Sequence, residues 1–262
     1  MSEPVTGVTF YDRIEGTHLR EYVNDPHHSS YYFYRAYIAL MELSLNRIDN
    51  DAPILDLGCG DGRFTLWLLA KGFTDIHALD SSSSNLKRLR AAIPTKQQGN
   101  VTTYHWEIMN SSFKSELFDA VLAIETLCFI AKPYHEILAH INPWIKPNGL
   151  LIGAEPALEG HILKHILNRN FAQAERTLET NTSLACHGVD TTPIQVFTKN
   201  LLLGAITASD LHAIDITGIS SLPTLVSPEE RENNVALLGL LTGRLFHPYE
   251  NLYYIAIKPP HK

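Results

Sequence analysis

The sequence predicts an α/β fold built on a doubly wound, mostly parallel sheet. The first observation is the segment 54–80, which reads as an apolar strand, a glycine-rich turn, an apolar helix and a second strand that ends in a carboxylate. The second is that strand-like apolar runs continue to alternate with helical patterns toward the C-terminus. Strands that alternate with helices favour a parallel sheet whose crossover helices cover both faces.

A helix is expected before the first strand. From Ser30 onward, Tyr34, Ile38, Met41 and Leu45 recur at helical spacing, which indicates a helix that packs one face on the sheet.

The glycine-rich turn follows the first strand directly and has glycines at 58, 60 and 62. Glycine has no Cβ atom, so a ligand can approach the backbone, and glycine permits the positive φ angles that a tight turn needs. The turn also opens the helix over 64–72, whose free N–H groups and positive dipole end attract an anion. We therefore expect a ligand to lie against the main chain here.

The spacing of the glycines separates two classes of nucleotide site. A dinucleotide fingerprint, G-x-G-x-x-G, would place its third glycine at Arg63. This chain instead has G-x-G-x-G, with Asp56 two residues before the first glycine. Asp80 ends the next strand, where an acid can accept hydrogen bonds from the hydroxyls of a ribose. The pattern disfavours a nicotinamide oxidoreductase.

The segments that follow continue the alternation. The hydroxyl-rich residues 81–85 can cap the next helix. Alternating β-branched and aromatic residues over 101–106 predict a third strand.

The residues 54–62 and Asp80 resemble the first two motifs of the class I S-adenosylmethionine (SAM)-dependent methyltransferases. Later landmarks come in the family's order: 118–121 resembles its fourth strand, and 144–152 its Leu-Lys-Pro-Gly-Gly turn and fifth strand, with an asparagine in place of one glycine. The resemblance covers roughly residues 54–155. It implies a Rossmann-like sheet of seven strands with an antiparallel last strand, a helical cap and lid, and SAM as the cofactor, with S-adenosylhomocysteine (SAH) as the product.

The resemblance also implies which residues contact the cofactor. Glu107, where the family more often has Asp, matches the acid that contacts the adenine amine, and Glu125 ends the strand beneath the methionine part. Ser81 is expected along the adenine edge or as a helix cap. Tyr11 is expected on the cofactor or as packing in the N-terminal cap. The expected cofactor-binding residues are Tyr11, Asp56, Gly58, Cys59, Gly60, Asp80, Ser81, Glu107, Ile108 and Glu125.

The chain is expected to form a single domain with four regions. We expect an N-terminal helical cap over 1–50, a SAM-binding core over 51–155, a lid insertion over 156–200, and C-terminal strands over 201–262 that complete the sheet. An insertion after the fifth strand would lie beside the methyl-donor end of the cofactor, so substrate identity is expected to be set there.

The insertion and the C-terminal region have their own patterns. The insertion predicts one or two helices over 158–178, a polar loop over 181–193 and an extended segment over 195–199. Further along, we expect a helix over 201–209, a strand over 211–219, a helix over 228–245 and a final strand over 252–257.

Composition narrows the function classes. With 262 residues, a net charge of −7 and a pI near 6.0, the chain has no general attraction for a polyanion, so a nucleic-acid partner is not expected. The basic run 87–90 is interpreted as a solvated helix face. Three separated cysteines predict neither a disulfide framework nor a metal site. No leader or membrane-spanning run is found, so we expect a cytoplasmic protein without a membrane partner. The sequence leaves the oligomeric state open.

Methyl transfer from a sulfonium requires chiefly that nucleophile, methyl and sulfur be aligned. A general base is needed only if the nucleophile arrives protonated. The candidate bases include Glu125 and Glu155 at strand ends, and the histidine pairs His27/His28 and His161/His165. His161 and His165 are four residues apart and could share a helix face, but two ligands do not predict a metal site.

The predicted function is SAM-dependent methyl transfer to an oxygen or nitrogen atom of a small molecule. Two alternatives stay open: methylation of a protein or RNA, and SAM binding without catalysis.

Overall fold

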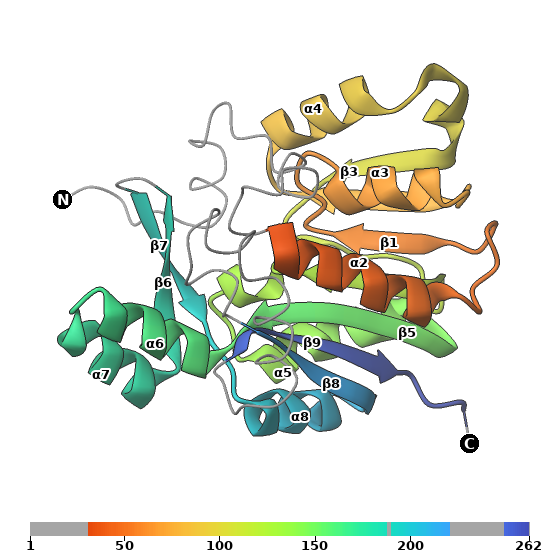
Figure 1. The fold of residues 1–262 in the computed structure, drawn as a ribbon. Helices are drawn as coiled ribbons and strands as arrows, with labels where there is room; N and C mark the ends of the chain where they lie inside the picture. The colour runs from red at the N-terminus through yellow and green to blue at the C-terminus, as the bar shows by residue number, and fades with distance from the viewer. Residues whose placement is uncertain (1–30, 188–189, 221–248, 262) are drawn as a thin grey trace, which may run out of the picture.

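The computed structural model describes residues 31–187, 190–220 and 249–261 (Figure 1). In this part of the chain, seven strands form one sheet in the order β3-β2-β1-β4-β5-β9-β8. Strands β1 to β5 pair in parallel, whereas β9 lies between β5 and β8 and is antiparallel to both. The predicted Rossmann-like sheet with an antiparallel last strand is confirmed. The strands are β1 Ile54–Leu57, β2 Ile76–Asp80, β3 Val101–His105, β4 Phe118–Ile124, β5 Ile145–Pro156, β8 His212–Ser220 and β9 Tyr249–Ile257.

Helices cover both faces of the sheet, as Figure 1 shows. Successive side chains of a strand point to opposite faces. In β1, Ile54 packs with the helices α2, α3 and α4, whereas its neighbour Leu55 packs with α5 and α8. Both faces are buried, which explains why the strands are almost continuously apolar. These helices are α2 Tyr31–Leu45, α3 Arg63–Ala70, α4 Ser83–Ala92, α5 Tyr134–Ile141 and α8 Lys199–Ala208.

In the described residues, four short 3-10 helices connect these elements. They are η2 Thr95–Asn100, η3 Ile108–Asn110, η4 Leu127–Phe129 and η5 Asn142–Trp144.

The insertion after β5 forms helices α6 Leu158–Leu167 and α7 Phe171–Thr180, followed by a hairpin of β6 Thr182–His187 and β7 Asp190–Gln195. Figure 1 places these elements together beyond the carboxyl ends of the parallel strands. The predicted helices are present, but the predicted polar loop over 181–193 is wrong.

The amino-acid composition of the hairpin explains why a loop was predicted there. Its inward-facing positions include Ser183 and Thr192, which are buried although polar, and Ile194 is the apolar member of this set. Small polar residues and a proline indicate a loop when read locally, whereas here each Cα has an antiparallel partner, such as Ser183 with Ile194.

Some predictions fall outside the described residues. These are the position of Tyr11, the histidines at 27 and 28, and the helix expected over 228–245. In the part that the structure describes, none of the helices combines the length and the apolar character needed to cross a membrane.

Candidate functional site

The glycine-rich turn joins β1 to α3 with three positive φ angles. Gly58, Gly60 and Gly62 have φ values of 67°, 55° and 97°, a region that favours glycine. The amides of Gly58 and Cys59 donate to the carbonyl of Leu79 at 2.7 and 3.0 Å, which fixes the turn to β2. Cys59 is buried.

Two of these glycines are needed for packing. A Cβ atom on Gly58 would lie 2.3 Å from Cγ2 of Thr126, and one on Gly62 would lie 2.3 Å from Cδ1 of Leu89. The prediction that all three glycines leave their Cβ positions open for a ligand is therefore wrong at Gly58 and Gly62, because neighbouring side chains occupy those positions.

Asp80 organises the end of β2. Its Oδ2 accepts from the amide of Gly60 and its Oδ1 from the amide of Ser82, both at 2.8 Å. A carboxylate accepts hydrogen bonds from donors, and a ligand hydroxyl is such a donor. Asp80 is only 9% exposed, which makes it part of the structure as well as a candidate ligand contact.

The cap of α4 is Ser82. Its Oγ accepts from the amide of Asn85 at 3.2 Å. Ser81 is half-buried at the end of β2, and its carbonyl pairs with Nε2 of His105 at 3.0 Å. The structure therefore corrects the alternative that Ser81 itself caps the helix.

Asp56 ties β1 to the first turn of α3. Its Oδ2 accepts from the hydroxyl of Thr65 at 2.6 Å. Burial raises the pKa of Asp56 to about 6, although the Thr65 hydrogen bond and the charge of Arg63 oppose that rise. In the structure this acid holds the helix in place.

Glu107 and Ile108 follow β3. Glu107 is exposed, and its Oε2 accepts from Nδ2 of Asn110 at 2.8 Å. Ile108 is 9% exposed and packs in the core on the α5 side, where its carbonyl pairs with Nε2 of His140 at 3.0 Å. Both residues lie at the carboxyl edge of the sheet, to which Asp80 also belongs.

Glu125 follows β4 and is held by three donors. It has a positive φ of 53°. Its Oε2 accepts from Tyr34 at 2.8 Å, and its Oε1 accepts from Tyr37 at 3.1 Å and from Nδ2 of Asn251 at 3.0 Å. One carboxylate thus joins α2 and β9 to the end of β4. The guanidinium of Arg63 lies 3.9 Å from the centre of the Tyr34 ring.

Sequence reasoning missed these partners of Glu125. The tyrosines are three residues apart on one helix, which is a local signal of a shared face. Nothing local connects them with a carboxylate about ninety positions away or with Asn251.

A cavity of about 640 Å³ opens beside Glu125. The insertion forms most of its wall, and the other side is formed by Glu125 after β4, by η4, by the end of β5 and by β9. Its lining residues are Glu125, Cys128, Phe129, Pro156, His161, Lys164, His165, Asn168, Asn170, Gln173, Leu184, Ala185, Thr191, Ile194 and Asn251.

The other candidate bases differ in their surroundings. Glu155 is fully buried, where Tyr134 donates to its Oε1 at 2.8 Å and the amide of Cys128 donates to its Oε2 at 3.2 Å. Burial raises the pKa of Glu155 to about 8 in spite of these donors. His161 and His165, by contrast, line the cavity.

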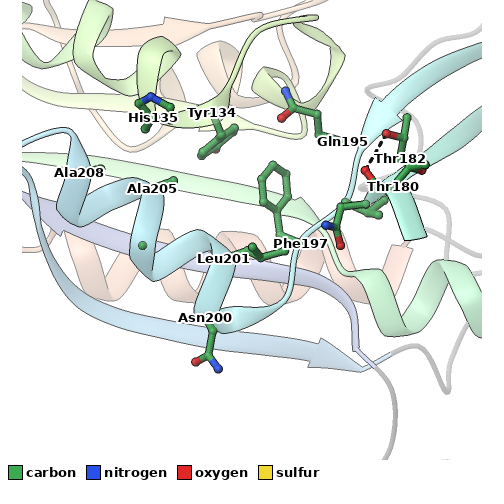
Figure 2. A pocket seen from close by; sticks show the side chains of 13 residues that line it. Tyr134, His135, Thr180, Thr182, Gln195, Phe197, Asn200, Leu201, Ala205 and Ala208 are labelled. Carbon is green, nitrogen blue, oxygen red and sulfur yellow. Dashed lines mark hydrogen bonds between the residues drawn. The ribbon is translucent and has the colours of Figure 1, made fainter. Parts of the chain in front are cut away.

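A second cavity, of about 440 Å³, lies between α5, α8 and the strand β7 (Figure 2). The rings of Tyr134 and Phe197 are in contact there, with centroids 4.6 Å apart. Gln195 donates through Nε2 to the carbonyls of Ile130 and Lys132 at 2.8 and 3.0 Å. Among the predicted cofactor-binding residues that the structure describes, none lines this cavity.

Comparison with known proteins identifies the core of the chain. Residues 54–149 match a family model described as a methyltransferase domain, and this stretch contains the glycine turn, Asp80 and Glu125. These residues form a class I SAM-dependent methyltransferase domain. The cofactor of such a domain is SAM.

The relatives of this methyltransferase domain cover different shares of the chain. The ubiquinone biosynthesis O-methyltransferase of Rickettsia conorii is 30% identical over 115 residues, which are 43% of this chain and 38% of that protein. The chain thus spans well under half the length of that curated relative.

Solved structures extend the likeness in fold beyond the methyltransferase domain. A SAM-dependent methyltransferase from Methanosarcina mazei has a TM-score of 0.63 at 21% identity and covers 84% of this chain and 98% of its own. The cyclase SpnF has a TM-score of 0.65 at 16% identity, with 97% and 96% covered. At such identities the likeness concerns the fold alone.

Proposed function

We propose that this protein transfers a methyl group from SAM to an oxygen or nitrogen atom of a small molecule. The observation that carries the proposal is the cavity beside Glu125. The cavity opens at the carboxyl edge of the sheet. It lies next to the glycine turn, because Glu125 lines it and the side chain of the neighbouring Thr126 packs on Gly58. In open α/β sheets, ligands bind at this edge.

The proposed cofactor position follows from the turn and the strand ends. Asp80 accepts the ribose hydroxyls, while Glu107 and Ile108 bound the adenine. Gly58, Cys59 and Gly60 border the methionine part. The methyl then points toward Glu125 and the cavity.

A small acceptor fits this arrangement better than a macromolecule. The cavity has about 640 Å³, a volume typical of small-molecule sites, and is walled by the insertion. The net charge of −7 gives a nucleic acid no general attraction. The ubiquinone biosynthesis O-methyltransferase among the relatives also supports a small molecule and an oxygen acceptor.

In the reaction, the acceptor attacks the methyl in line with the departing sulfur. Bound SAM would supply the methyl: the bond from acceptor to methyl would form as the bond from sulfur to methyl breaks, the electron pair would stay on sulfur to give neutral SAH, and a proton on the acceptor would pass to a base or to water. The role of this chain is to hold the two reactants in that geometry and to exclude water.

Isothermal titration with SAM tests the cofactor part of the proposal. Asp80→Asn keeps the size of the side chain but removes its charge, so we expect SAM to bind about 10-fold to 100-fold more weakly, as hydrogen bonds to a charged group contribute about 1.5–3 kcal/mol. Asparagine is chosen because its amide oxygen can still accept from one of the two backbone amides, whereas an alanine would leave the amides of both Gly60 and Ser82 without their acceptor. Asp51→Asn, at an exposed position, is the matched control.

Turnover is tested separately by incubating the protein with SAM and a set of phenols, alcohols and amines, with mass spectrometric detection of SAH and the methylated product. Unchanged SAM affinity in a folded Asp80→Asn variant would contradict the ribose assignment. SAM binding without any methylated product would favour a binding protein instead.

A further inference from the structure

Two histidines of the insertion meet at one buried hydroxyl. His161 and His165 lie one turn apart on α6, and both line the cavity beside Glu125. Nδ1 of His161 and Nε2 of His165 each lie 2.9 Å from Oγ of Ser183 on β6. Ser183 is 1% exposed and does not line the cavity, so it lies behind the two rings.

Both imidazoles are neutral at ordinary pH. Burial and the charge of Lys164 lower the pKa of His161 to about 3. The same two causes lower the pKa of His165, which is the more open of the two rings. Within the described part of the chain, the other charged residue that lines the cavity is Glu125, whose carboxylate already accepts three hydrogen bonds.

The hydroxyl of Ser183 requires the two imidazole rings to carry their protons on different sides, one toward Ser183 and the other away from it. A hydroxyl has one proton, so it donates to one imidazole and accepts from the other. A neutral imidazole has one N–H and one bare nitrogen. The ring that donates to Ser183 therefore has a bare outer nitrogen, and the ring that accepts from Ser183 has an outer N–H. Among the described residues, neither Nε2 of His161 nor Nδ1 of His165 has a hydrogen-bond partner.

We propose that His161, His165 and Ser183 form the acceptor-recognition site of this cavity, and that the acceptor is a hydroxylated molecule, phenol or alcohol. The proposal rests on the methyl transfer proposed above. We assign the outer N–H to His161 and the bare nitrogen to His165, because the more open ring bears a positive charge at lower cost.

The chemistry balances with these roles. Nε2–H of His161 donates to the acceptor oxygen, and the acceptor hydroxyl donates to Nδ1 of His165. As the oxygen–methyl bond forms, the sulfur–methyl bond breaks and the acceptor's proton passes to His165. The positive charge moves from the sulfonium to the imidazolium, which then releases the proton to water.

A hydroxyl fits the pair better than an amine. A hydroxyl both donates and accepts, which matches one bare nitrogen and one N–H, whereas an ammonium group only donates.

The alternative is a purely structural tie between α6 and β6, and two conservative variants separate the two roles. His161→Asn keeps a polar atom near Nδ1, and His165→Gln keeps one near Nε2, so both retain the bond to Ser183. Each lacks the outer nitrogen. His135→Asn, on the exposed side of α5, is the control.

The probe is 4-nitrocatechol, added to the protein with SAM for turnover and with SAH for binding. We expect His161→Asn to raise the KM for the probe at least about 10-fold, and His165→Gln to lower kcat at least about 10-fold. SAM affinity should stay within about twofold in both variants, because neither residue belongs to the proposed cofactor contacts.

Three results would overturn the inference while the proposed function stands. In the first, the wild type binds SAM and methylates amines but no hydroxyl compound; in the second, it binds SAM but neither binds nor methylates the probe or the other phenols and alcohols. In the third, the kinetics of both histidine variants equal those of the control. Failure of the wild type to bind SAM would instead overturn the proposed function, and the inference with it. Ser183→Ala supplies the structural comparison, since a structural tie alone predicts lost stability there and normal kinetics in the two histidine variants.

Discussion

The buried carboxyl group of Glu155 should make the stability of the protein depend on pH. The change to test is Glu155→Gln, which keeps the shape of the side chain. The amide oxygen can accept from the Cys128 amide, and the amide N–H₂ can donate to Tyr134, whose own proton can turn to the hydroxyl of Tyr254, 3.0 Å away. The variant therefore removes the charge and keeps a hydrogen bond to both the Cys128 amide and Tyr134.

The direction and the size of this pH effect follow from the protonation of Glu155 in the folded and the unfolded state. In the folded protein the pKa of Glu155 is raised from 4.5 to about 8, chiefly by burial. Between these values the folded state keeps the proton and the unfolded state loses it, so the free energy of unfolding falls as pH rises. The full difference corresponds to about 5 kcal/mol, at 1.36 kcal/mol per pH unit. Because water penetration reduces such penalties, we expect a loss of at least about 2 kcal/mol.

Urea unfolding followed by tryptophan fluorescence from about pH 5 to about pH 8.5 measures this loss. The wild type should weaken with rising pH relative to Glu155→Gln, and the gap should stop growing above about pH 8. Asp56, with its pKa raised to about 6, contributes in the same direction to both proteins and cancels in the difference. Glu136→Gln, at an exposed position of α5, is the control. Parallel curves for the wild type and Glu155→Gln would refute the reasoning.

Three further substitutions test contacts near the sheet edge. Gly58→Ala should lower the free energy of unfolding in urea by several kcal/mol, because φ at this residue is positive and a Cβ atom would meet the Thr126 side chain. Gly99→Ala, with open space around it, should lower that free energy little. Equal losses in the two variants would contradict this. Tyr37→Phe should lower stability by about 1–2 kcal/mol through the lost hydrogen bond to Glu125, and thermal unfolding that matches wild type would count against that bond. Ser82→Ala should cost about 1 kcal/mol as a lost helix cap, measured by the same method; no change would mean that the cap contributes nothing.

The sheet and its turn were predictable because the signals are local. Glycines at alternate positions, an acid at a strand end and alternation of apolar strands with apolar helices all lie within short windows of sequence.

The hairpin and the surroundings of Glu125 were not predictable in the same way. The hairpin buries Ser183 and Thr192, residue types that are usually exposed, so its pattern is that of a loop. The partners of Glu125 come from α2 and β9, far away in sequence, and their meeting depends on the packed fold.

The position of β9 has a consequence for how the chain acquires its shape. This strand is almost the last part of the sequence, yet it lies between β5 and β8 and supplies the pairing for both. Until residues 249–257 have been synthesised, β5 keeps an open edge and β8 has no neighbour in the sheet. Such late, non-local pairing slows folding and leaves an unpaired edge exposed during translation. A ribosome-bound fragment that stops at residue 220 should therefore be a target for chaperones, whereas one that continues through β9 should not.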